Sequence, residues 1–305
     1  MNQKKLWKSI AAILCAGTLT LPFAGCGGKE DKAAFTIAYA PNESTEQSAD
    51  ARNGLAKDLS EKLGMTVKEI QASDYNAIIE ALRTGKADMA YMGPLAVGLA
   101  SERAQAEPIA MKAVDGDKAK AVYHSLFITG SKNTSINTIQ DVKGKTIAFV
   151  DPDSTSGNLV PSYEIMKAFP NEGLTSDILH TNGKFFEAAS YSGKHQAGLQ
   201  AVIKGDVDVV PISDQILASE IANGNAKESD VKTIHTSDAI PAEAMTVRKD
   251  LDPALKQTLI DFLTAYDNQD YFNLVIKEPT ARFVPCSIRD YQTIIDLNKT
   301  LNSGE

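Results

Sequence analysis

The chain has 305 residues, of which 43% are hydrophobic and 23% are charged, and its formal net charge is −8 at pH 7. This negative balance argues against nucleic acid as a partner, because binding to a phosphate backbone depends on clustered positive charge. Three cysteines are too few for a disulfide framework or a cysteine metal cluster. The length is enough for two domains of typical size.

The first 25 residues have the pattern of a secretory leader, with three lysines before an apolar run at residues 10–23. That run is too short and wrongly flanked for a transmembrane helix. Small residues directly before Cys26 fit a lipoprotein cleavage site, so we expect Cys26 to be the lipid-bearing first residue of the mature protein. We expect residues 26–34 to be a flexible polar tether.

Removal of the leader leaves 28 Lys plus Arg against 39 Asp plus Glu, a formal net charge of −11. With Cys15 removed and Cys26 carrying lipid, Cys286 remains as the one free cysteine, and we expect it to be a small buried apolar residue.

Strands and helices alternate after the tether. The first unit is predicted to contain strands and helices in the order β-α-β-α-β, at residues 35–40, 49–63, 66–72, 74–85 and 86–94. This order is typical of a parallel sheet flanked by helices, in which ligands bind at the carboxyl ends of the strands.

A second alternating unit begins near Ser125. We expect strands at residues 126–129, 145–150, 179–181 and 206–211, and a helix within residues 191–205 that ends at Gly205. The chain then crosses back, and helices at residues 253–266 and 291–301 close it. Such a path predicts a two-lobed clamp with two crossing strands, and a ligand in the cleft between the lobes. Lobe one would comprise residues 35–124 and 238–305, and lobe two residues 125–237.

Residues 151–161, DPDSTSGNLVP, lie where the strand KTIAFV turns into a helix. Hydroxyls of Ser154, Thr155 and Ser156 would converge there with free backbone N–H groups at the positive end of the helix dipole, which favours a phosphate-like anion. An ordinary helix N-cap would use the same residue types. The local sequence leaves both interpretations open.

Four stretches together resemble a known family, at residues 74–94, 123–161, 193–210 and 240–253. They are similar to the phosphate, phosphite and phosphonate receptors of ABC importers, which have the type II periplasmic-binding-protein fold. The resemblance implies an α/β protein of two lobes, each a mainly parallel sheet flanked by helices, joined by two crossing strands. It also implies an extracytoplasmic monomer that delivers a phosphorus oxyanion to a membrane permease, without a cofactor.

The resemblance further implies that Ser154, Thr155 and Ser156 hold the phosphoryl oxygens. Family contacts match Tyr75, Tyr123 and His195, while Tyr91 lies at the same edge and carries less weight. Tyrosine can donate one hydrogen bond to an anion while excluding water. Packing against the following helix is the alternative for both Tyr75 and Tyr123.

Family members that prefer aminoalkylphosphonates hold the substrate amine with two acidic residues. Glu243 matches one of these positions, but the other aligns with Gln215, with Asp214 one residue earlier. This departure favours small oxyanions such as phosphate, phosphite or methylphosphonate, without excluding aminoethylphosphonate. Asp214 and Glu243 could equally be solvated surface carboxylates.

An enzyme is not expected, because the chain has no GxSxG elbow, no HExxH motif and no Walker loop. Four histidines leave little for a metal centre, so we expect no metal. The alternatives to an importer receptor are a receptor for another anion such as a sulfonate, and a ligand-sensing partner of a signalling protein.

Overall fold

The computed structural model describes residues 34–43 and 45–302 of the chain. The expected leader and Cys26 lie outside these residues, as does the tether apart from its last residue. Within the described part, no helix combines the length and the apolar character needed to cross a membrane.

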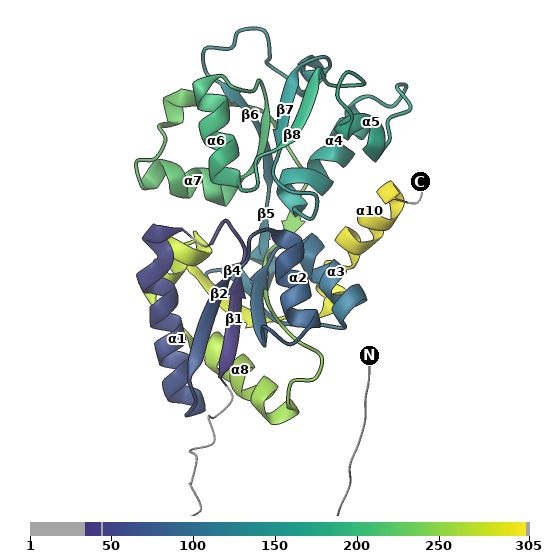
Figure 1. The fold of residues 1–305 in the computed structure, drawn as a ribbon. Coiled ribbons are helices and arrows are strands. Elements are labelled where there is room, and N and C mark those ends of the chain that lie inside the picture. The colour runs from purple at the N-terminus through teal and green to yellow at the C-terminus, as the bar shows by residue number, and fades with distance from the viewer. Residues whose placement is uncertain (1–33, 44, 303–305) are drawn as a thin grey trace, which may run out of the picture. The chain divides into compact units, whose positions relative to one another are not determined.

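The first body, which we call lobe one, is built on a six-stranded sheet with the order β13-β4-β12-β3-β1-β2 (Figure 1). Its strands are β1 (Phe35–Tyr39), β2 (Val67–Gln71), β3 (Met89–Met92), β4 (Glu107–Val114), β12 (Ala244–Val247) and β13 (Ala281–Pro285). Its helices are α1 (Ala49–Leu63), α2 (Tyr75–Arg83), α3 (Pro94–Ala104), α8 (Pro253–Ala265), α9 (Gln269–Tyr271) and α10 (Gln292–Asn302).

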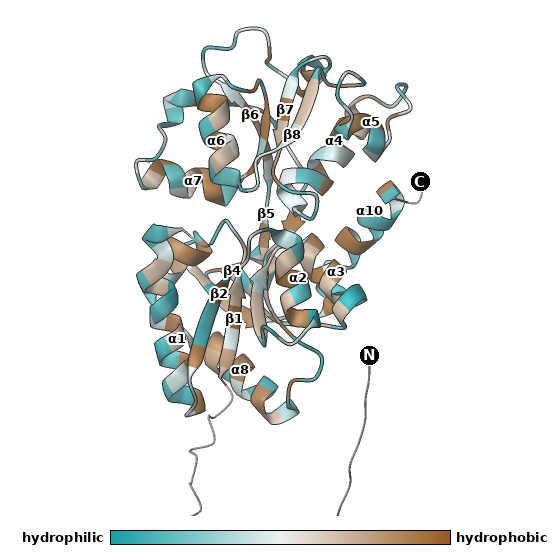
Figure 2. Ribbon diagram, viewed as in Figure 1, coloured by the Kyte–Doolittle hydropathy of each residue, from teal (hydrophilic) through white to brown (hydrophobic). Residues whose placement is uncertain are grey.

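Alternate side chains of β1 enter the two cores of lobe one. Ala38 packs with the core beneath α2, α3 and α10, whereas Ile37 and Tyr39 pack with the core beneath α1 and α8. Successive side chains of a strand point to opposite faces, so both faces of the sheet are covered. Hydrophobic residues on the strands and on one side of the helices are visible in Figure 2.

The second body, lobe two, has smaller sheets. Its strands are β6 (Ser125–Gly130), β7 (Thr146–Phe149), β8 (Ala188–Tyr191), β9 (Val210–Ser213) and β10 (Val231–Thr236), with β6 between β10 and β9 and with β7 beside β8. Its helices are α4 (Val160–Ala168), α5 (Ser176–His180), α6 (His195–Lys204) and α7 (Asp214–Ala222). A parallel bridge between Ile147 and Val209 links the two small sheets.

The two lobes are connected by a short antiparallel pair, β5 (Val122–Tyr123) and β11 (Ile240–Pro241), in which Tyr123 is opposite Ile240. These are the two crossing strands that the chain path predicts. Tyr123 is therefore placed at the junction of the lobes by the backbone itself.

Two details differ from the sequence predictions. Parallel pairing is limited to β1 with β2 and β3, to β7 with β8 and to the bridge beside them, while the other strand pairs are antiparallel. Strand β12 follows the return crossing rather than a helical crossover, and it runs against β3 and β4. Strand β13 comes after α8 and α9 and runs against β4. Residues 179–181 are not a strand: Thr175 caps α5, which ends at His180, and the strand beside β7 is β8.

Candidate functional site

The serine loop, residues 151–161, forms a tight turn from β7 into α4. Ser154 is the N-cap, and its hydroxyl accepts a hydrogen bond from Gly157 N at 3.1 Å. A π-helical turn, Thr155–Leu159, then leads into α4. A Cβ atom at position 157 would collide with the side chain of Val150, so a glycine allows the turn to press against the end of the strand.

This turn forms part of the wall of a small cavity, about 20 Å³ in volume, between the lobes. Most of the residues that line it have polar side chains, and they come from both lobes: Ala40, Asn42, Glu43, Tyr75, Tyr91, Met92, Gly93, Tyr123, Ser154, Thr155, Ser156, His195, Ser213, Ile216 and Glu243. The structure thus brings together eight of the nine residues that the sequence singles out for ligand binding. Asp214 does not line the cavity.

Hydrogen bonds join the lobes around this cavity. Leu95 N at the start of α3 donates to Thr155 Oγ1 at 2.8 Å, so lobe one binds the serine loop directly. His195 N at the start of α6 donates to Asn42 Oδ1 at 3.1 Å, and Gln196 Nε2 donates to Asn42 O at 3.2 Å. The cavity is therefore held between lobes that are already in contact.

Three buried tyrosines supply neutral donors. Burial raises the pKa of Tyr75, Tyr91 and Tyr123 well above the usual value, so all three phenols keep their protons at neutral pH. Asn42 donates to Tyr75 OH. Among the described residues, Tyr91 OH and Ser213 Oγ have no hydrogen-bond partner. Buried hydroxyls without partners are costly, and the oxygens of a ligand in the cavity could accept from them.

His195 is also neutral in this setting. Burial and, to a smaller extent, the nearby charge of Lys277 lower its pKa to about 3. Its Nε2 lies 3.4 Å from Ser156 Oγ. A neutral imidazole can offer one N–H group to an anion without adding a full charge.

Two carboxyl groups share the cavity with these donors. Burial raises the pKa of Glu43 to about 7, and Glu243 contributes to the rise. Glu243 Oε2 forms an ion pair with Lys112 Nζ at 2.7 Å. An ionised carboxylate can only accept a hydrogen bond, so it suits a ligand that carries a proton. A protonated carboxyl group can instead donate its own proton to an oxygen of the ligand.

The sequence analysis did not single out Asn42, Glu43, Lys112 or Ser213. Asn42 and Glu43 follow β1, at the carboxyl end of the strand, where ligands bind in parallel sheets. Their position in the sequence could therefore have indicated a role in the site. Lys112 lies inside a strand and is only 3% exposed, and nothing in the local pattern marks it as part of a site.

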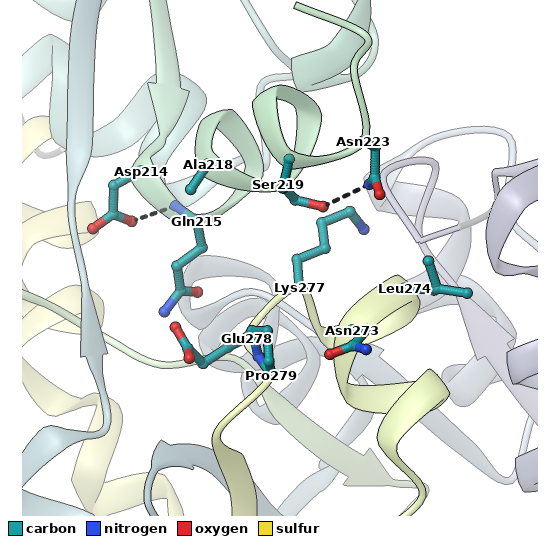
Figure 3. Close-up of a pocket in the computed structure, with 11 residues that line it drawn as sticks. Asp214, Gln215, Ala218, Ser219, Asn223, Asn273, Leu274, Lys277, Glu278 and Pro279 are labelled. Carbon is teal, nitrogen blue, oxygen red and sulfur yellow. Dashed lines mark hydrogen bonds between the residues drawn. The ribbon is translucent and has the colours of Figure 1, made fainter. Parts of the chain in front are cut away.

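A wider pocket, about 700 Å³ in volume, lies next to α7 (Figure 3). It lies between α7 of lobe two and residues 273–279 of lobe one, and Asp214, Gln215 and Lys277 contribute to its walls. The Asp214 carboxylate accepts a hydrogen bond from Gln215 N at 2.8 Å, and burial raises its pKa. Asp214 therefore lines the wider pocket and not the cavity beside the serine loop.

Residues 37–291 match the family described as "ABC transporter, phosphonate, periplasmic substrate-binding protein". The chain is 28% identical to the phosphate-import protein PhnD of Mycolicibacterium smegmatis over 72% of its length and 67% of that protein. It is 29% identical to the phosphonates-binding periplasmic protein of Escherichia coli over 78% of its length and 68% of that protein.

Solved structures agree with this match. The binding-protein component of an ABC phosphonate transporter from Pseudomonas aeruginosa superimposes with a TM-score of 0.75 at 25% identity, covering 88% of this chain and 86% of that chain. PhnD1 of Prochlorococcus marinus gives the same TM-score at 20% identity, covering 88% of this chain and 98% of that one.

Fold and site together define a two-lobed solute receptor of the type II periplasmic-binding-protein class, which confirms the expected fold. The chain belongs to the phosphonate-binding periplasmic substrate-binding proteins of ABC transporters. This is a family of extracytoplasmic transport proteins rather than of enzymes. Among the described residues, no group of His, Cys, Asp and Glu side chains could hold a metal ion.

Proposed function

We propose that this protein captures a small phosphorus oxyanion in the cavity between its lobes and delivers it to the permease of an ABC transporter. The observation that carries the proposal is the serine loop at the start of α4, which forms one wall of a cavity rich in neutral donors. Such donors bind an anion without neutralising its charge, which suits a ligand that must later be released.

The size of the cavity favours a ligand without a long tail. Its volume of about 20 Å³ only modestly exceeds the roughly 10–15 Å³ that a single water molecule needs on the same measure. The oxygens of a tetrahedral oxyanion surround one phosphorus atom closely, so such an ion without a substituent is the most compact ligand of this class. A substituent of several atoms would have to displace part of the wall.

The relatives support a phosphorus oxyanion as the ligand class, but their names do not agree on one particular ligand. Their names refer to phosphate for the mycobacterial protein, to phosphonates for the Escherichia coli protein and to phosphite for a Prochlorococcus marinus protein 25% identical to this chain. The Prochlorococcus PhnD1 structure contains methylphosphonate. Phosphate, phosphite and methylphosphonate are therefore the candidates for this chain.

For the location, we propose that lipid on Cys26 anchors the mature protein to the cell membrane as a monomer, on the periplasmic side or the outer face. The leader pattern before Cys26 supports this anchor. A Cys26→Ala chain should leave the membrane fraction, and its retention there would contradict the anchor.

The binding site is tested by a pair of identical substitutions, one in the loop and one in the helix after it. Ser156→Ala removes a hydroxyl that lines the cavity, and we expect affinity to fall roughly ten- to a hundred-fold, as for loss of a charge-assisted hydrogen bond. Ser162→Ala removes a buried hydroxyl of α4 that does not line the cavity, and affinity should not change. Equal affinities of both variants in calorimetric titrations would place the ligand elsewhere.

A further inference from the structure

Lys112 lies within β4, and its ammonium group is buried beside the small cavity that the serine loop lines, which we call the oxyanion cavity. The side chain is 4% exposed. Nζ lies 2.7 Å from Glu243 Oε2, donates to Gln215 Oε1, and lies 3.5 Å from Ile276 O. Of these three oxygen atoms, Gln215 Oε1 and Ile276 O accept hydrogen bonds from the ammonium group, and Glu243 Oε2 forms an ion pair with it.

These contacts place Lys112 between two hollows, the oxyanion cavity and the wider pocket next to α7. Glu243 lines the oxyanion cavity, whereas Gln215 lines the wider pocket. Lys112 Nζ also lies 5.8 Å from the ring centre of Tyr123, which is another wall of the oxyanion cavity. The ammonium group therefore lies between side chains that line one hollow and a side chain that lines the other.

The charges lead to the same conclusion. Without a cation beside it, the Glu243 carboxylate would face a bound oxyanion and repel it. Lys112 neutralises this carboxylate from within the protein, so the cavity needs no positive charge from the ligand. A ligand with an ammonium tail would find the carboxylate and the Gln215 amide oxygen already occupied, and its charge would lie close to that of Lys112.

We propose that Lys112 is a specificity-determining residue, whose ammonium group occupies the place beside Glu243 that the amine of an aminoalkylphosphonate would need. The receptor thereby accepts phosphorus oxyanions without a cationic tail and rejects those that carry one. This inference rests on the proposed function, because it assigns the ligand class within the same cavity.

The test compares two ligands of nearly equal size, 2-aminoethylphosphonate and propylphosphonate, which differ in the amine. Methylphosphonate reports on binding without a tail. In calorimetric titrations the wild-type protein should bind methylphosphonate most tightly and should gain nothing from the amine. In Lys112→Ala, binding of 2-aminoethylphosphonate relative to propylphosphonate should rise about ten-fold or more, because the freed Glu243 carboxylate pairs with the amine.

Two further variants separate charge from space. Lys112→Arg keeps a cation in place and should still reject the amine. Lys112→Ala combined with Glu243→Gln opens the same space without a free carboxylate, so the gain for the amine should disappear. Lys112→Met, which retains most of the apolar stem, replaces Lys112→Ala if thermal unfolding shows that the alanine variant is not folded.

The inference is overturned if the wild-type protein prefers 2-aminoethylphosphonate to methylphosphonate, or if removal of the Lys112 charge leaves the ratio of the two tailed ligands unchanged. Failure of the proposed function would be distinguishable, because the wild-type protein would then bind none of the phosphorus compounds.

Discussion

Glu43 shows at the scale of one residue how burial in the cavity changes a side chain. Its carboxyl group is buried among Lys277, Glu243 and Lys112, and its charge also acts on Tyr75. Burial raises its pKa from 4.5 to about 7, and the two lysines only partly oppose the rise. At pH 6 the Glu43 carboxyl group is therefore mostly protonated in the folded protein and mostly ionised in the unfolded chain.

This difference predicts how stability depends on pH. Because folding raises the pKa of Glu43, the protonated carboxyl group stabilises the folded protein. This stabilisation is fully present below about pH 4.5 and is lost as the pH rises through about 7. Glu43→Gln is neutral at every pH and lacks this loss. Between pH 5 and 8 the wild-type free energy of unfolding should fall by on the order of 2–3 kcal/mol relative to the variant.

Urea unfolding at pH 5, 6, 7 and 8 measures this difference. His195, with a folded pKa of about 3, changes stability in the opposite sense between about pH 3 and 6.5, but it is present in both proteins and cancels in the comparison. If the two proteins gave parallel curves over this range, Glu43 would not hold a proton in the folded state.

At the scale of secondary-structure elements, α6 is capped by the other lobe. Its own N-cap residue, Lys194, makes no capping side-chain hydrogen bond. Asn42, in the loop after β1, accepts from the first N–H group of the helix instead. Asn42 O also accepts from Lys277 Nζ at 3.0 Å. Because this cap joins the two lobes, it forms only when they are closed.

Loss of this cap should therefore act on ligand release. Asn42→Ala should raise the dissociation rate constant about ten-fold, the equivalent of a capping bond, and leave the association rate constant nearly unchanged. Asp252→Ala is the matched control, because Asp252 caps α8 within lobe one through Ala254 N and Leu255 N. It should lower stability by about 1 kcal/mol without changing release. Stopped-flow kinetics showing equal dissociation rates for both variants would contradict a cross-lobe role for Asn42.

Elements with a strong local signal could be predicted from the sequence. The leucine stripe at residues 49–63 and the left-handed Gly64 after it gave the bounds of α1, and Asp74 caps α2 as expected, accepting from Ala77 N at 2.7 Å. Contacts that depend on the other lobe could not be predicted. Asn42 lies in a loop without periodicity, and the partners of Lys112 are more than 100 residues away in the sequence.

At the scale of the whole molecule, the cavity is complete only when both lobes contribute. Lobe two supplies the serine loop and His195, while lobe one supplies Tyr75, Tyr91 and the carboxyl groups. A ligand that contacts both sets of groups favours the closed arrangement over the open one. We also expect an ionised carboxyl group in the cavity to discriminate between anions, because phosphate and phosphonates can carry a proton near neutral pH and donate it to the carboxylate, whereas sulfate cannot.

The most direct test is isothermal titration calorimetry of the chain without residues 1–26, unfolded and refolded to remove any ligand carried through purification. Phosphate, phosphite, methylphosphonate and sulfate are titrated in turn. Tight binding of at least one phosphorus oxyanion, with no binding of sulfate, is the predicted result. Sulfate binding as tightly as the phosphorus compounds, or no binding at all, would contradict the account.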